Sequence, residues 1–211
     1  VFNKFLLKKA KKNKNIFLLT ADLGYNSFEI FQSQISDRFV NCGVSENNMI
    51  GIATGLALRG KKVFVYSIIP FLIHRSFEQI KNNIAVSNLD IKLVGAGGGF
   101  SYAEQGVSHN PTEDIAIMNT LPNFKIFSPG TRSESLSMIN YMISSKGPSY
   151  IRLTKAPEFD YINKKNISKL NPSIVQKGKK VLILVTGNII ENVINALPIL
   201  EKKGIKPTIV S

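Results

Sequence analysis

The sequence has few of the side chains that commonly bind metal ions or cross-link a chain. Cys42 is the only cysteine, so a disulfide within the chain and a cysteine-based zinc site are both excluded. With only two histidines, His74 and His109, a histidine-rich metal centre is excluded as well. No apolar run approaches the roughly 20 residues of a membrane-spanning helix. These absences favour a protein of the reducing cytoplasm that has no metal site of its own and no membrane segment.

Acidic residues are scarce too. The chain has 14 acidic and 27 basic residues, which gives a formal net charge of +13. Much of the excess is lysine, gathered in residues 4–14 and 164–180. Neither segment has the mixture of arginine and aromatic residues that is typical of nucleic-acid-binding proteins. We therefore expect a solvated basic surface and no nucleic-acid partner, with a polyanion-binding module as the alternative of a different class.

Short apolar runs alternate with helical patterns along the first 155 residues. The expected strands are 16–19, 63–66, 91–95, 125–127 and 150–153. The expected helices are 1–14, one starting near Ser27, 45–58 with Ser45 as its N-cap, 70–86, 113–119 capped by Thr112, and 131–144. Strands that are apolar on both faces indicate a sheet covered by helices on both sides. The sequence therefore predicts an α/β fold with a doubly wound, mostly parallel sheet.

The pattern also predicts a division of the chain. Residues 1–156 form the expected first domain, and the polar, lysine-rich segment 157–178 is the expected linker. Residues 179–211 follow as the start of a second α/β domain, with one βαβ unit over 181–210. Because a single βαβ unit cannot bury both faces of its strands, we expect this second domain to continue beyond Ser211.

Glu46 and His109 are the side chains most suggestive of chemistry. Glu46 lies in the first turn of a helix whose other residues are mostly small or apolar. Considered alone, it is better explained as an acid that stabilises the helix N-terminus by ~0.3–1 kcal/mol. His109 ends a long glycine-rich loop over 96–111. The glycines 97–99 in this loop are not a dinucleotide-binding motif, since no helix follows them directly.

Four segments together change this interpretation. They are Leu-Thr-Ala-Asp-Leu-Gly at 19–24, the segment 38–57 around Val-Ser-Glu-Asn-Asn-Met, Gly-Val-Ser-His-Asn-Pro-Thr-Glu-Asp at 106–114, and Leu-Pro-Asn-Phe at 121–124. In this order and spacing they resemble the transketolase family, over its pyrimidine-binding domain and the start of its C-terminal domain. The resemblance implies thiamine diphosphate as the cofactor and transfer of a two-carbon ketol unit between sugars.

The resemblance also implies roles for individual residues. Glu46 matches the glutamate that hydrogen-bonds the aminopyrimidine ring nitrogen of the cofactor and so promotes loss of its C2 proton. Phe71 matches the aromatic residue that stacks on the pyrimidine, and Ile68 and His74 are expected beside it. His109 matches a histidine that faces the reacting carbon and the substrate. Glu46 and His109 are therefore the expected catalytic residues.

The expected substrate site departs from ordinary transketolases. Gln105 stands where they have an aspartate that contacts the donor, and Asn26 where a serine helps to bind phosphate. Lys155 replaces an arginine that binds the substrate phosphate, and Gly97 replaces a histidine. These changes predict a roomier pocket and argue against a standard pentose phosphate. They are similar to changes in the split transketolase-like proteins of bacterial surface-polysaccharide sugar biosynthesis.

The Gly-Asp-Gly motif that holds the diphosphate and its divalent metal in this family does not occur in the sequence. The resemblance therefore implies an N-terminal partner subunit that supplies this half and binds Mg²⁺ or Ca²⁺, in an α2β2 assembly. The small residues from Gly51 to Ala57 are the expected contact face. Alternatives are a β-type subunit of a 2-oxo-acid dehydrogenase, a relative of deoxyxylulose-phosphate synthase, or a non-catalytic partner that retains the fold.

Overall fold

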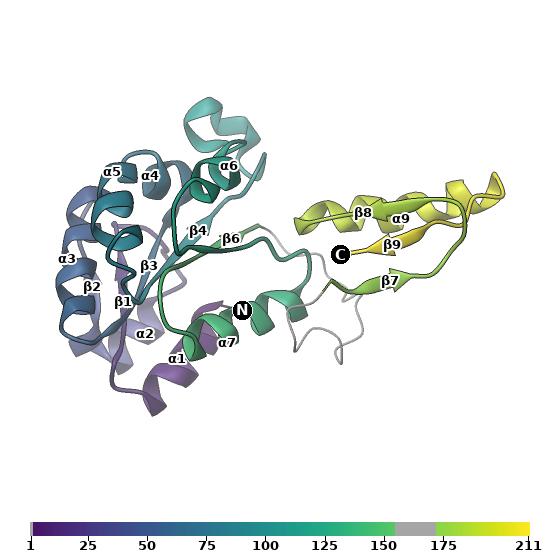
Figure 1. Cartoon of the computed structure of the whole chain (residues 1–211). Helices are drawn as coiled ribbons and strands as arrows, with labels where there is room; N and C mark the ends of the chain where they lie inside the picture. The colour runs from purple at the N-terminus through teal and green to yellow at the C-terminus, as the bar shows by residue number, and fades with distance from the viewer. Residues whose placement is uncertain (1, 155–171) are drawn as a thin grey trace.

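A six-stranded sheet organises the first part of the chain. The computed structural model describes residues 2–154 and 172–211. Its strands lie in the order β2-β1-β3-β4-β6-β5, and each neighbouring pair is parallel. They are β1 (Ile16–Thr20), β2 (Phe39–Asn41), β3 (Lys62–Ile68), β4 (Ile91–Ala96), β5 (Lys125–Phe127) and β6 (Ser149–Leu153). The predicted parallel sheet is confirmed (Figure 1).

Helices cover both faces of this sheet (Figure 1). One face carries α3 (Glu46–Leu58), α4 (Ile69–Ile73), α5 (Phe77–Gln79) and α6 (Asp114–Asn119). The other carries α1 (Phe2–Lys12), α2 (Glu29–Gln34) and α7 (Arg132–Ser144). In β3, Val63 and Val65 pack on the first face and Phe64 on the second. This alternation of buried side chains explains why the strands are apolar throughout, and it confirms the doubly wound architecture.

Two details of the predicted helices are wrong. The expected helix 70–86 is broken into α4, α5 and a π-helical turn over Ile80–Ala85. Its apolar spacing fits an α-helical period, so the sequence pattern does not reveal the break. Thr112 does not cap α6, because Glu113 is at the N-cap and the Thr112 hydroxyl donates to the Glu113 carboxylate. Ser45 is the N-cap of α3 as predicted, although its side chain makes no capping hydrogen bond.

A second, three-stranded sheet follows in the order β7-β9-β8. Its elements are β7 (Ile174–Gln176), β8 (Leu182–Leu184), α9 (Ile190–Lys202) and β9 (Thr208–Val210). The parallel pair β8–β9 with α9 between them confirms the predicted βαβ unit. Strand β7 pairs antiparallel with β9 inside the segment expected to be a linker, so that expectation is wrong for 174–176. This short strand is recognisable only from its pairing, since two of its three residues are apolar but no period extends beyond them.

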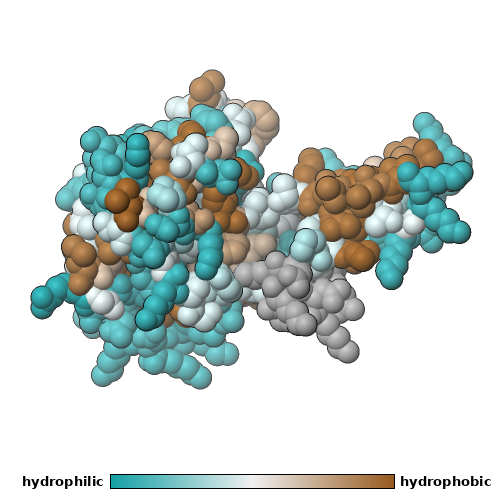
Figure 2. Space-filling model, in the orientation of Figure 1, coloured by the Kyte–Doolittle hydropathy of each residue, from teal (hydrophilic) through white to brown (hydrophobic). Residues whose placement is uncertain are grey.

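The second sheet leaves apolar side chains at its surface (Figure 2). Leu182 and Leu184 of β8 are 60% and 73% exposed. Contacts between this part of the chain and the first include a hydrogen bond of 3.0 Å that Ser211 donates to Glu134 of α7, and the close approach of Gly130 to the backbone of Gly187. In the described part of the chain, no helix has the length and apolar character needed to span a bilayer.

A buried lysine lies at the amino ends of β3 and β4. Lys92 is inaccessible to solvent; its amine lies 2.8 Å from the Asp90 carboxylate and donates to the Gly147 carbonyl at 2.6 Å. Lys62 shares this carboxylate and donates to the Ser145 carbonyl at 2.6 Å. Burial lowers the pKa of Lys92 to about 8, against the opposing attraction of Asp90. The loop before β6 is thereby tied to the sheet by charged hydrogen bonds.

We expect Lys92→Met to change how the stability depends on pH. Unfolded Lys92 has a pKa of 10.5 and folded Lys92 one of about 8, so between these values the unfolded chain binds more protons. The penalty for burying the charge is full below pH 8 and is relieved as the pH rises towards 10.5. The free energy of unfolding of the wild type should therefore rise relative to the variant by roughly 3 kcal/mol over this window.

Urea unfolding of both proteins at several pH values measures this difference. The exposed Lys14 provides the control, because Lys14→Met removes a lysine that lies outside the buried cluster. A difference between wild type and Lys92→Met that stays constant from pH 7.5 to pH 10 would contradict the prediction.

Candidate functional site

The predicted site residues lie near the carboxyl ends of the parallel strands. Glu46 opens α3 shortly after β2 ends, Ile68 is the last residue of β3, and His109 lies in the loop that follows β4. Because all six strands run the same way, these ends meet at one edge of the sheet. Open α/β sheets bind ligands at this edge.

Glu46 is a charged residue in a buried position. Its side chain is 2% exposed, among the apolar residues of the first face of the sheet. One carboxylate oxygen, Oε2, accepts a hydrogen bond from Arg75 Nη1 at 3.0 Å. The other, Oε1, is buried and has no hydrogen-bond partner among residues 2–154 and 172–211. An unsatisfied buried oxygen is costly, so this atom is suited to accept a hydrogen bond from a ligand.

Aromatic rings lie next to this carboxylate. The Arg75 guanidinium lies over the Phe71 ring, 4.0 Å from its centre, and so connects Phe71 with Glu46. The His109 ring meets Phe71 at 5.0 Å between centres, with its plane turned by 74°. His109 Nδ1 lies 2.9 Å from the Ser108 hydroxyl. The structure therefore brings Glu46, Phe71 and His109 together.

Tyr102 belongs to the same cluster, although no sequence motif marks it. Its ring lies 6.4 Å from that of His109. Gly97 has a φ of +84°, and a Cβ added there would overlap the Tyr102 ring. Tyr102 therefore fills the space that the missing side chain of Gly97 leaves. The expectation of a roomier pocket at Gly97 is wrong, because a residue five positions later occupies it.

Two further residues expected beside the pyrimidine lie around this cluster. His74 ends α4, and its Nε2 is 3.5 Å from a Glu113 carboxylate oxygen. Ile68 precedes α4 and is half-buried. The pKa of Glu113 is lowered mainly by the hydrogen bond from the Thr112 hydroxyl. The charge interaction with His74 also lowers it. Position 74 is therefore linked to the segment that carries His109.

The expected substrate residues are less closely joined to the cluster. Asn26 adopts a φ of +60° in the loop after β1, and its backbone N–H donates to Glu29 at 2.6 Å. Gln105 is exposed in a short turn before His109. Within the described residues, no side-chain hydrogen bond joins either of them to Glu46 or His109. Lys155 lies outside the described residues.

A buried hydrogen-bond network holds the segment after His109. Asp114 accepts from the Tyr150 hydroxyl at 2.5 Å and lies 3.1 Å from Arg152 Nε. Arg152 also donates to the Pro111 carbonyl at 3.1 Å. Burial, with the Asp114 charge, raises the pKa of Tyr150 well above its usual value, so its hydroxyl remains a donor. The network connects β6 with the start of α6, directly behind the loop of His109.

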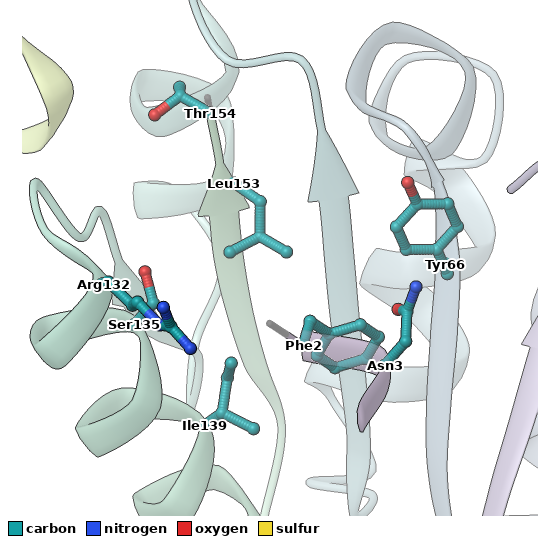
Figure 3. Close-up of a pocket in the computed structure, with 8 residues that line it drawn as sticks. All are labelled: Phe2, Asn3, Tyr66, Arg132, Ser135, Ile139, Leu153 and Thr154. Carbon is teal, nitrogen blue, oxygen red and sulfur yellow. The ribbon is translucent and has the colours of Figure 1, made fainter. Parts of the chain in front are cut away.

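A separate hollow of about 290 Å³ lies on the other face of the sheet (Figure 3). Phe2, Ile139 and Leu153 line it with apolar atoms, and Asn3 and Arg132 add polar groups. Burial raises the pKa of Tyr66, at its wall, to about 12. The sheet separates this hollow from Glu46. In the residues that the structure describes, no group of three or more His, Cys, Asp or Glu side chains is placed to hold a metal ion.

Residues 1–157 match the pyrimidine-binding domain of transketolase. The chain belongs to the transketolase family. It is 34% identical over 183 residues to one subunit of the apulose-4-phosphate transketolase of Actinobacillus succinogenes, covering 86% of this chain and 58% of that one. It is 32% identical over 202 residues to a 6-deoxy-6-sulfo-D-fructose transketolase subunit of Clostridium sp., covering 95% of this chain and 63% of that one. The chain thus spans about three fifths of these two relatives.

The structure also resembles that of a split-gene transketolase that forms an inactive β4 tetramer. The TM-score is 0.85 and the sequence identity 28%, and the similarity covers 99% of this chain and 68% of that one. The similarity in fold therefore covers both the domain that contains Glu46 and the second, three-stranded part of the chain.

We expect Tyr150→Phe to destabilise the fold. The substitution removes the hydroxyl donor from the buried Asp114 carboxylate and leaves the packing of the ring unchanged. The cost should be ~1–3 kcal/mol in the free energy of unfolding, measured by urea denaturation. Tyr25→Phe is the matched control, since Tyr25 is 72% exposed. Equal stability of the two variants would show that the network does not support the loop of His109.

Proposed function

We propose that this chain is the C-terminal subunit of a split, thiamine-diphosphate-dependent transketolase. In this proposal it transfers a two-carbon ketol unit from one sugar to another. The observation that supports the proposal best is the buried Glu46 carboxylate, one oxygen of which has no partner among the described residues. Phe71 is connected to this carboxylate through Arg75, and His109 through Phe71. A helix-terminus acid without a binding role has no reason to be buried with an unpartnered oxygen.

The residues fit the aminopyrimidine half of the cofactor. The unpartnered Glu46 oxygen is suited to a donor on a ring nitrogen, and Phe71 is an aromatic surface on which a flat ring can stack. Ile68 and His74 are the proposed neighbours of the ring. When bound, the cofactor supplies a carbon nucleophile that the side chains of a protein cannot provide.

Glu46 and His109 have distinct proposed roles. Glu46 offers its unpartnered oxygen to the ring nitrogen of the cofactor for a hydrogen bond, and burial excludes the water that would compete for this bond. His109 is held through Nδ1 by the Ser108 hydroxyl, which leaves Nε2 for a proton of the substrate. Asn26, Gln105 and Lys155 are the proposed substrate contacts.

A partner subunit completes the proposed site. The diphosphate and its Mg²⁺ or Ca²⁺ require the Gly-Asp-Gly motif, which is absent from this sequence. Val44 and Val107, which lie close in sequence to Glu46 and His109, are 74% and 94% exposed and so are available to a protein partner. On α3, a Cβ at Gly51 or Gly55 would meet nothing within 4 Å. We infer an α2β2 assembly with this edge of the sheet at the interface.

We expect proton exchange at C2 of thiamine diphosphate to require both subunits and Glu46. The wild-type chain with its partner and Mg²⁺ should catalyse exchange, whereas the chain alone should not. Glu46→Gln keeps the size of the side chain but removes its transferable proton, so exchange should slow by ~10²–10⁴-fold. Hydrogen–deuterium exchange followed by NMR measures this rate. Fast exchange by Glu46→Gln would leave Glu46 with only a structural role.

We further propose that the acceptor differs from an ordinary pentose phosphate and belongs to surface-polysaccharide sugar biosynthesis. Gln105 carries no charge where ordinary transketolases have an aspartate, and the Tyr102 ring occupies the place beside Gly97. The two named relatives, whose names specify apulose 4-phosphate and 6-deoxy-6-sulfo-D-fructose, support a departure from the common substrates.

The expected outcome is that ribose 5-phosphate is a poor acceptor and a nucleotide-linked sugar a better one. The measurement is kcat/KM of the two-subunit complex for ribose 5-phosphate and a panel of nucleotide-linked sugars as acceptors, with the two ketoses named for the relatives as ketol donors. Turnover of ribose 5-phosphate at ~10⁴ M⁻¹s⁻¹ or above, with none of the others accepted, would overturn this proposal. Decarboxylation of pyruvate without ketol transfer would favour a dehydrogenase-type subunit instead.

A further inference from the structure

Arg75 makes two contacts that no other described residue makes together. Its Nη1 donates to Glu46 Oε2 at 3.0 Å, and its guanidinium lies 4.0 Å from the centre of the Phe71 ring. The guanidinium is planar and delocalised, so it stacks on an aromatic face and forms a charged hydrogen bond at the same time. Both ends of this bridge are residues of the proposed cofactor site.

These two contacts are those that the proposed function requires of a pyrimidine ring. The Glu46 carboxylate is bonded to the guanidinium that covers Phe71, so it lies on the same side of the Phe71 ring. A ring that stacks on Phe71 and also bonds to Glu46 must therefore occupy the face that the guanidinium now covers. At 4.0 Å from the ring centre there is no room for a second planar group between Phe71 and Arg75. The two occupants therefore exclude each other.

We propose that Arg75 competes with the cofactor ring for the face of Phe71 beside Glu46, and that it must swing away before the ring binds. The inference relies on the proposed function only for the identity of the ring. The Arg75 side chain is 47% exposed and lies in the turn between α4 and α5, where the helix is broken. In the described part of the chain it makes no other hydrogen bond, so its displacement breaks a single bond and one stacking contact.

The contact has a physical reason in the isolated chain. A buried carboxylate without a partner is strongly destabilising, and Arg75 provides the counter-charge. Ring binding replaces this partner, so part of the binding free energy is spent on releasing Arg75. Anchoring of the diphosphate on the partner subunit raises the local concentration of the ring and thus favours the exchange.

The first test is the affinity of the two-subunit complex for thiamine diphosphate with Mg²⁺, measured by calorimetry. Arg75→Gln removes the competing cation, and we expect binding to become roughly tenfold tighter. Arg75→Lys keeps a charge without the planar stacking group and should give a smaller gain. Arg59→Gln, at an exposed arginine after α3, is the matched control and should not change the affinity. Weaker or unchanged binding by Arg75→Gln would overturn the proposal.

The second test follows the Arg75 side chain of the wild-type sequence, and a variant serves only to assign its signal. Stacking on Phe71 should shift the NMR signals of the Arg75 side chain upfield in the isolated chain, and Phe71→Leu should abolish this shift. Saturating thiamine diphosphate in the complex should abolish it as well. A shift that persists in the saturated complex would show that Arg75 and the ring bind together.

The two proposals fail in different ways. Absence of ketol transfer in a complex that binds thiamine diphosphate and loses the Arg75 shift would refute the proposed function and leave the competition intact. Ketol transfer together with a persistent shift would refute only the competition.

Discussion

A carboxylate removed from water is the constraint that shapes this edge of the molecule. Glu46 opens a helix that packs on the sheet, so its charge is carried into the apolar core with it. One carboxylate oxygen accepts a hydrogen bond from Arg75, and the other has no hydrogen-bond partner in the described residues. Phe71 is drawn into the arrangement through Arg75, and His109 through Phe71. The ion pair of Arg75 with Glu46 thus follows from the cost of burying a single charge, and it joins the aromatic residues to that charge.

The two edges of the sheet handle buried charge differently. At the amino ends, Lys92 and Lys62 surround Asp90 and reach backbone carbonyls, so the charged groups are mostly satisfied by the chain itself. At the carboxyl ends, Glu46 keeps an unsatisfied oxygen. The charged groups of the amino edge thus connect the segment before β6 to the sheet, whereas the carboxyl edge retains the capacity to bind.

Patterns with a local physical cause were predictable from the sequence. Strands that are buried on both faces are apolar throughout. The alternation of such strands with helices along the sequence predicted the parallel sheet. Glu46, Phe71 and His109 were found because their surroundings resemble a family, and the structure brings them together; their roles stay predictions. Arg75, Tyr102 and β7 were missed, because each depends on a contact between segments that no local pattern encodes. The break after α4 was missed because the turn over 74–76 does not interrupt the helical spacing of the apolar residues on either side of it.

The Tyr102 ring fills the space that a side chain at position 97 would need, so the residues at these two positions are expected to covary among homologues. A side chain at 97 has a place only if the ring at 102 leaves it, and the ring is held in place only while 97 has no Cβ. A side chain that appears at position 97 while Tyr102 is present would overlap the ring. It would also strain the backbone, since position 97 has a conformation that favours glycine. Homologues with a histidine at position 97 are therefore expected to have a smaller residue at position 102. The residue pair at 97 and 102 should then distinguish one branch of the family from another.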